Sequence, residues 1–485
     1  MHRLRVAPPL VFAEVLFLSI ASLLLNIPLV FGQVNPPAEV SQLTLADESP
    51  PAISDPNLSI ETVATGLKRP VAMAFLGNSS DDIIVVEKDN GTVRRVIDGV
   101  VQSEPLVDVA VANDNNTNER GLLGMAVAPQ NDSTTYVFLY YTESGGGQDG
   151  DDAQGIVPVG NRLYRYELSE DPFTGTAKLI NPKLLLDLPA RPGPRYNGGP
   201  LLVGQNPTTH ETIVYLIIGD LDHHETQSQN EEDGPPPDGT SGILAVDTDG
   251  NPLPNPILVR PTTDSADDGE EEEEDDEDNE DGETSEEDIG MLPYYYAYGI
   301  RNSFGMDFDP VTGQIWDTEN GRNDSDEINL VLPGFNSGWP VIQGPASRHE
   351  DVDVDDDLVD FDGRGVYRDP EFTWITTVGP TAIKFYNSTH LGAGYQNDIF
   401  VGDINNGRIY HFDLNEDRTG LMLEDNGALE DKVADNPDEL SSGGVVFGTG
   451  FSAISDIEVG PDGNLYLALY HAGKIMKISP EAPQQ

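Results

Sequence analysis

Short apolar stretches alternate with polar residues along most of the chain, from about residue 60 to its C-terminal end. Gly, Asn, Asp and Pro separate these stretches, as is typical of β-strands joined by tight turns. No long stretch repeats its apolar residues with the 3.6-residue period of an amphipathic helix. The pattern therefore predicts an all-β domain over residues 61–480.

The predicted strands fall into a repeating unit, in which an apolar strand, a tight turn and a second strand lead into a further alternating strand. Six such units start near residues 83, 136, 214, 306, 398 and 457. Since the blades of a β-propeller are small sheets repeated around an axis, this repeat predicts a six-bladed β-propeller with four strands in each blade. Loops from distant parts of the chain would then meet around one shallow pocket.

The first 32 residues are predicted to be a targeting segment. A basic start with Arg3 and Arg5 is followed by a nearly apolar run, residues 15–31, which is the pattern of a signal peptide or an N-terminal anchor. Glu14, Asn26 and Pro28 are unfavourable inside a membrane and favour the cleaved signal. We therefore expect a secreted or cell-surface protein, with residues 33–60 as a linker.

The chain is strongly acidic, with a formal net charge of −59 and no cysteine. A run of 18 carboxylates lies between residues 264 and 288, and we expect residues 263–289 to be a disordered insert between blades. The rest of the chain still carries −41, so acidic residues are spread over the whole sequence. This charge argues against a nucleic-acid partner, and the lack of cysteine excludes disulfides and thiolate metal sites.

Four motifs occur in a fixed order. They lie at 118–126 (NERGLLGMA), 298–305 (YGIRNSFG), 318–340 (TENG, DEIN and GFNSGWP) and 460–466 (GPDGNLY). Together they resemble the signatures of the glucose/sorbosone dehydrogenase family, and the third match is the most specific. The resemblance implies a six-bladed propeller that oxidises the anomeric carbon of aldoses, with pyrroloquinoline quinone (PQQ) and Ca²⁺ as cofactors.

The resemblance also implies roles for individual residues. Glu119, Arg301 and Asn302 match positions beside the cofactor and the substrate, and Asp220 matches an aspartate that faces the pocket. The backbone carbonyls that hold the active-site Ca²⁺ are implied at Gly321 and Arg322, because such ligands tolerate a changed side chain.

Other family positions carry different residues in this chain. Tyr196 stands where the family has its catalytic histidine, and a phenol is a poor base near neutral pH. Asn405 stands at the position of a lysine that binds a PQQ carboxylate, and Ala453 and Ser455 replace two arginines. Two hypotheses follow: an aldose dehydrogenase that uses a quinone and Ca²⁺, or a non-catalytic extracellular propeller that binds a glycan or a protein partner.

Three further features have a structural and a functional interpretation. Asp326 and Glu327 are expected to organise a turn rather than to perform acid–base chemistry, and Trp339 is expected to anchor a blade by core packing. His223 and His224 could replace the missing base or bind a metal with Asp222, although adjacent histidines on a polar loop are more often solvated. The alternating acids at 351, 353, 355 and 357 are interpreted as a solvated run rather than a Ca²⁺ loop.

Overall fold

In the computed structural model, residues 50–114, 119–131, 134–206, 208–222, 224–259, 289–423 and 427–482 are described. Within them, strands dominate, and the single α-helix is the short α2 (Pro437–Ser442). None of the described helices is long and apolar enough to span a membrane. The targeting segment, residues 1–32, lies outside the described residues, and so does all but the last residue of the acidic insert 263–289.

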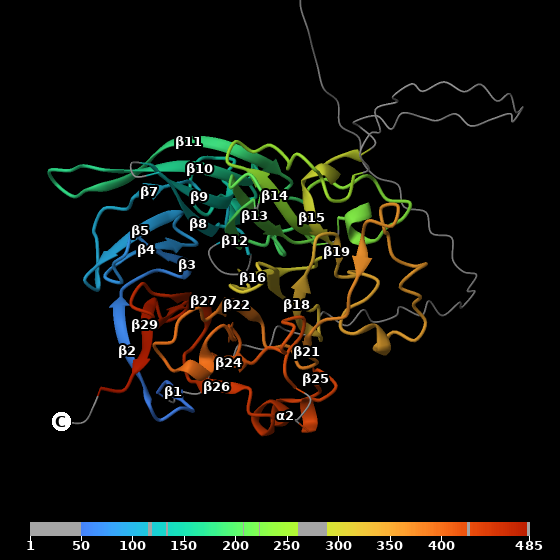
Figure 1. The fold of residues 1–485 in the computed structure, drawn as a ribbon. Coiled ribbons are helices and arrows are strands. Elements are labelled where there is room, and N and C mark those ends of the chain that lie inside the picture. Colours follow the sequence, from blue (N-terminus) through green and yellow to red (C-terminus); the bar gives the residue numbers. More distant parts are fainter. Residues whose placement is uncertain are drawn as a thin grey trace, which may run out of the picture. The chain divides into compact units, whose positions relative to one another are not determined.

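The strands form six sheets (Figure 1). The first sheet contains, in hydrogen-bonded order, β3 (Pro70–Phe75), β4 (Asp82–Glu87), β5 (Thr92–Ile97) and β6 (Val100–Val101), and β7 (Val107–Asp108) also pairs with β5. The second contains β11 (Ala177–Leu188), β10 (Gly160–Glu170), β9 (Thr134–Glu143) and β8 (Leu122–Asn131). The third contains β12 (Leu201–Gln205), β13 (Thr212–Ile218), β14 (Gly242–Asp247), β15 (Tyr295–Tyr298), β19 (Phe335–Asn336) and β20 (Val366–Tyr367).

The other three sheets follow along the chain. The fourth sheet contains β16 (Ser303–Phe308), β17 (Ile315–Glu319), β18 (Asp326–Val331), β21 (Phe372–Trp374) and β25 (Val433–Ala434). The fifth contains β22 (Pro380–Phe385), β23 (Ile399–Asp403), β24 (Ile409–Phe412), β26 (Val446–Thr449) and β1 (Ala52–Ile53). The sixth contains β27 (Ile454–Val459), β28 (Leu465–Leu469), β29 (Lys474–Pro480) and β2 (Leu58–Thr65).

The sheets are arranged in a ring through their inner strands. Strand β3 contacts β8, β8 contacts β12, and the series continues through β16, β22 and β27 back to β3. Each pair of consecutive sheets encloses one buried apolar cluster; Trp316 and Tyr410, for example, lie in the cluster between the β16 and β22 sheets. The core of the domain is therefore divided into inter-sheet layers around the ring.

The two ends of the ring are joined in one sheet. Strand β2, near the start of the described chain, pairs antiparallel with β29 near its end, and Ile60 lies opposite Ile478 (Figure 1). Strand β1 pairs with β26 in the preceding sheet. The last residues of the predicted linker 33–60 are thus strand residues, which corrects that boundary, because their backbone groups complete sheets built by the C-terminal end of the chain.

The predicted all-β propeller class is confirmed, whereas the prediction of six blades with four strands each is not met as stated. Only the β8–β11 sheet and the β27 sheet contain four strands, and the others contain five or six. The additional strands are short segments, such as β19, β20 and β25, that come from loops and pair at the outer edges of sheets. They cover edges whose backbone groups would otherwise be unpaired.

Removal of residues 50–66 should strongly destabilise the domain, since it exposes the edge of β29 and the apolar cluster that contains Leu58 and Ile478. We expect a fall in the melting temperature of about 10 °C or more, or failure to fold, because several buried apolar side chains lose their contacts at once. The control is a chain that starts at residue 50. Equal melting temperatures for the two chains, measured by circular dichroism, would show that β2 does not close the ring.

Candidate functional site

The loops that precede three successive inner strands meet at one place. Glu119 precedes β8, Tyr196 precedes β12, and Asn302 directly precedes β16. The carboxylate of Glu119 accepts a hydrogen bond from the Tyr196 backbone N–H at 2.6 Å and another from Asn302 Nδ2 at 3.3 Å. The structure therefore brings together residues that are up to 183 positions apart, as the sequence predicted.

Arg301 is the central cation of this site and is only 4% exposed. One guanidinium nitrogen donates to the carbonyl oxygens of Asn320 at 2.6 Å and Gly321 at 2.9 Å. The guanidinium carbon lies 4.0 Å from the ring centroid of Tyr196 and 5.3 Å from that of Trp339. Aromatic faces attract cations, so the two rings and the two carbonyls together fix the guanidinium.

Tyr196 is held in an unusual backbone conformation. Its φ of 59° lies in the left-handed region, which non-glycine residues rarely adopt. Gly219 makes the conformation possible, because a Cβ at residue 219 would lie 2.5 Å from the carbonyl oxygens of both Tyr196 and Arg301. Burial raises the pKa of Glu119, while the Tyr196 amide and the Arg301 charge oppose that shift.

Asp220 and Trp339 also belong to this site. The indole N–H of Trp339 donates to Asp220 Oδ2 at 2.7 Å, and the Asp220 backbone N–H donates to the Arg301 carbonyl at 3.0 Å. Trp339 was expected to anchor a blade by core packing. It is buried, but its ring also contacts the guanidinium, which sequence reasoning missed because the contact joins two separate loops, one after β15 and one after β19.

Glu319 is a second residue that the sequence did not assign. It accepts hydrogen bonds from the Arg301 backbone N–H and the Ser337 hydroxyl, both at 2.6 Å. Burial raises its pKa to about 7, against the opposing effects of these bonds and of the Arg301 charge. Its place in the TENG motif, directly before the carbonyls that hold Arg301, was the only signal available.

The loop after β17 is fixed by Asp326. This carboxylate accepts hydrogen bonds from the backbone N–H groups of Gly321 at 2.9 Å, Val378 at 2.6 Å and Gly379 at 2.8 Å. Burial raises the pKa of Asp326 to about 6. The carboxylate thus organises a turn, as predicted. Arg322 is exposed, and its backbone N–H donates to the Gln343 side chain at 3.2 Å.

The residues at the family's cofactor positions do not fit PQQ in the family's usual way. Asn405 is exposed beside Gly379, and the Ser455 hydroxyl donates to the Pro70 carbonyl at 2.6 Å, inside the sheet ring. Ala453 is buried and apolar. None of these three side chains offers a cation to a carboxylate, and the carbonyl of Gly321, one of the two implied Ca²⁺ ligands, already accepts from Arg301.

The histidine hypothesis is not supported by the structure. Residue 223 lies outside the described residues, and His224 Nδ1 pairs with Asp238 Oδ2 at 2.6 Å rather than with Asp222. The hydrogen bond to Asp238 raises the pKa of His224. This histidine is therefore part of a local ion pair.

A row of buried acids lies behind the site on β17 and β18. Asp317 is opposite Asn329, and Glu319 is opposite Glu327. Both carboxylate oxygens of Asp317 are fully buried and accept no hydrogen bond of good geometry, although the nearby Asn329 and Ser303 side chains still favour the charged form. Burial, followed by the neighbouring Glu319 charge, raises the pKa of Asp317 well above its usual value. A buried carboxylate without good hydrogen bonds is costly when it is charged.

These raised pKa values predict that the protein loses stability as the pH rises. A native state with raised carboxyl pKa values binds more protons than the unfolded chain does. The free energy of unfolding therefore falls from about pH 4.5 upward, until the carboxyl groups of the native protein have also ionised. For Glu319 this occurs near pH 7. Asp317→Asn removes one such ionisable group with little change in side-chain size. We expect this variant to match the parent at pH 5 and to melt a few degrees higher at pH 8.

The matched control is Asp351→Asn, at an exposed position, which should leave the melting curves unchanged. Thermal unfolding in the presence of a chelator measures both variants across this pH range. Destabilisation by Asp317→Asn that is equal at pH 5 and pH 8 would mean that its ionisation does not oppose folding.

Comparisons with known proteins agree with this fold. The chain is 24% identical over 428 residues to the aldose sugar dehydrogenase of Escherichia coli, covering 87% of this chain and 93% of that protein, and 25% identical over 440 residues to an uncharacterised protein of Synechocystis, covering 88% and 87%. The PQQ-bound aldose sugar dehydrogenase structure from Streptomyces coelicolor has a TM-score of 0.55 at 20% identity, over 87% of this chain and 98% of that one.

A family profile also matches the chain. The profile described as glucose / sorbosone dehydrogenase matches residues 67–263 and 275–477, which is most of the ring of sheets together with every loop of the Arg301 site. The chain therefore belongs to the glucose/sorbosone dehydrogenase family.

Proposed function

We propose that this protein binds an aldose sugar at the Arg301 site, the position at which its family acts on sugars. The observation that carries the proposal is the convergence of Glu119, Arg301 and Asn302 on one another and on two aromatic rings. Relatives of this chain are named aldose sugar dehydrogenase and quinoprotein glucose dehydrogenase. These names support a sugar as the ligand class.

The chemistry of the site suits a neutral sugar. Partly buried carboxylate and carboxamide groups can accept and donate hydrogen bonds to hydroxyls, and aromatic side chains offer apolar faces with a polar edge. Tyr196 and Glu119 remain partly exposed and can contact a ligand. With a net charge of −59, the protein repels anionic ligands, which favours an uncharged sugar over a sugar phosphate or a sugar acid.

Oxidation of the bound sugar at its anomeric carbon is the second candidate function. PQQ, when bound, would accept a hydride and Ca²⁺ would polarise the quinone. Family membership and the convergence of Glu119, Arg301 and Asn302 favour this activity. Two observations argue against this activity. Tyr196 replaces the histidine that serves as the family's base, and positions 405, 453 and 455 lack the three cationic side chains of the family. This set of residues therefore supports no catalytic step through the quinone.

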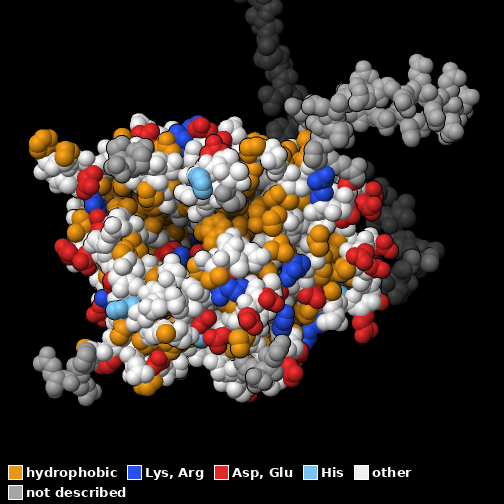
Figure 2. Space-filling view, in the orientation of Figure 1, with side chains coloured by type: hydrophobic (Ala, Val, Ile, Leu, Met, Phe, Trp, Pro, Cys, Tyr) orange, Lys and Arg blue, Asp and Glu red, His pale blue; other side chains and the backbone are white. Residues whose placement is uncertain are grey.

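We also propose that the protein acts outside the cell. The basic and apolar pattern of residues 1–32 supports export, and the acidic composition is compatible with an exposed, cation-rich surrounding. Figure 2 shows acidic side chains distributed over the visible face rather than gathered in one patch.

Sugar binding is tested by calorimetric titration of the purified protein with a panel of aldoses. We expect saturable binding that Tyr196→Ala weakens by about 3- to 30-fold, because the ring contact to Arg301 and the ligand-facing aromatic surface are both lost. The control is Val366→Ala, at an exposed position in β20. No binding of any aldose, or equal affinities for the parent and Tyr196→Ala, would contradict the proposal.

The oxidation hypothesis needs a separate experiment. We expect that PQQ and Ca²⁺ added to the parent protein give no saturable change in quinone absorbance and no sugar-dependent reduction of a dye. We expect the same of Tyr196→His, because a restored base does not restore the three missing cations. Sugar-dependent dye reduction by the parent protein would establish the dehydrogenase activity and overturn this expectation.

A further inference from the structure

Three side chains with metal-ligating atoms lie together on the β22–β26 sheet, remote from the Arg301 site. Asp398 directly precedes β23, His411 lies in β24, and Asp413 directly follows β24. The three side chains and the Asn405 loop lie at opposite ends of β23. Because β23 has five residues, the two ends are about 17 Å apart. No residue of the proposed sugar site belongs to this group.

The strand register places the three side chains on one face of the sheet. Ile399 is paired with Phe412 and Phe400 with His411, so the antiparallel alignment extends to put Asp398 opposite Asp413. His411 and Asp413 are two positions apart and therefore point to the same side. Like charges directly opposite each other on neighbouring strands are destabilising unless a cation lies between them.

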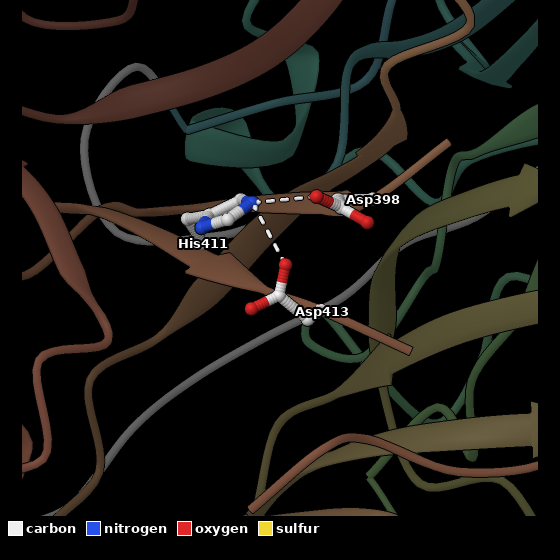
Figure 3. Close-up of side chains that lie close together, drawn as sticks. All are labelled: Asp398, His411 and Asp413. Atoms are coloured by element: carbon white, nitrogen blue, oxygen red, sulfur yellow. Dashed lines mark hydrogen bonds and ion pairs between the residues drawn. The ribbon is translucent and has the colours of Figure 1, made fainter. Parts of the chain in front are cut away.

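The three groups point toward one another (Figure 3). His411 Nε2 lies 3.1 Å from Asp398 Oδ2 and 4.0 Å from Asp413 Oδ1. One ligand atom from each residue can be chosen so that all lie within 4.8 Å of one another. Two ligands that bind a tetrahedral zinc ion at its usual bond lengths are roughly 3.3 Å apart. Small side-chain rotations would therefore close the three atoms around one ion.

The charge balance of the group is incomplete. Among the ion pairs of the described residues, Asp398 and Asp413 pair only with His411. Two carboxylates and a neutral imidazole carry a charge of −2, which a divalent cation neutralises and a single imidazolium does not.

The histidine ring is positioned before any ion binds. The rings of Phe400 at 5.0 Å, Tyr395 at 5.2 Å and Phe447 at 6.2 Å surround the His411 imidazole. Tyr395 is itself fixed by a hydrogen bond to Asp55 Oδ2 at 2.8 Å. The Asp413 side chain is 58% exposed, so an ion can reach the group from solvent. A fixed ring and an accessible carboxylate are what a metal site on a sheet surface requires.

We propose that Asp398, His411 and Asp413 form a binding site for a divalent transition-metal ion of the zinc type. One imidazole nitrogen and two carboxylate oxygens are ligands that such ions accept, whereas the nitrogen disfavours Ca²⁺ and Mg²⁺, which prefer oxygen ligands alone. Water completes the coordination on the exposed side. The alternative is an ion pair in which protonated His411 joins the two carboxylates without a metal.

The test uses the full-length protein, freed of metal with a chelator and kept in excess Ca²⁺ and high salt so that surface carboxylates and oxygen-only sites are occupied. Co²⁺ is added as a spectroscopic probe, and Zn²⁺ is titrated by calorimetry. We expect one ion per chain, a visible Co²⁺ spectrum that Zn²⁺ abolishes, and binding at least about 10-fold weaker in His411→Gln and in Asp398→Asn.

Two further variants make the outcome decisive. His390→Gln removes an exposed histidine of the loop between β22 and β23, and it should bind as the parent does. Asp413→Asn changes an exposed side chain, so it should fold even if the more buried variants do not, and it should also weaken Co²⁺ binding. Unchanged Co²⁺ and Zn²⁺ binding in Asp413→Asn and His411→Gln, or no binding by the parent, would leave only the ion pair and overturn the proposal.

Discussion

The pairing of β2 with β29 closes the ring of sheets and holds its first and last strands together. In a ring of sheets, the first and last sheets are neighbours in space although they lie at opposite ends of the chain. Strand pairing between the two chain ends is therefore needed to close the ring. Here the two ends of the described chain share one sheet, with a register that extends from Leu58 to Thr65. Once the ring is closed, each sheet has an apolar cluster on both sides, and the loops at one end of the inner strands are forced together.

Closure has an electrostatic consequence at the Arg301 site. The loops that meet there bring Glu119, Asp220 and Glu319 close to a single guanidinium, and nearby Asp317 and Glu327 add further buried carboxylates. Arg301 answers this excess only in part, because its guanidinium donates to the carbonyls of Asn320 and Gly321. Burial is the main cause of the raised pKa values of Glu119 and Glu319, and the Arg301 charge opposes it. A chain as acidic as this one has few cations, and Arg301 is fixed among several buried carboxylates.

Family membership and chemistry are separate conclusions for this protein. The family profile spans nearly the whole ring of sheets, whereas the departures from the family occupy a few positions. A fold persists through such changes when the new side chains fit; the Ser455 hydroxyl in β27, for example, donates to the Pro70 carbonyl. Tyr196 shows the effect of one change: in place of a base, its ring covers the guanidinium of Arg301. The same scaffold can therefore keep the polar group around Arg301 while the side chains at other family positions change.

Local alternation, turn residues and motifs were enough to predict the all-β class, the family and the loops that form the site. The contacts that fix each site residue could not be predicted in this way. The stacking of Tyr196 and Trp339 on Arg301, the hydrogen bond from Trp339 to Asp220 and the contacts of Glu319 all join segments that are distant along the chain, and no local pattern records such contacts. The group of Asp398, His411 and Asp413 likewise depends on strand register, which is fixed only when β23 and β24 pair. Edge strands such as β19 and β25 were missed for the same physical reason: two-residue segments have no periodicity, and only a neighbouring backbone makes them strands.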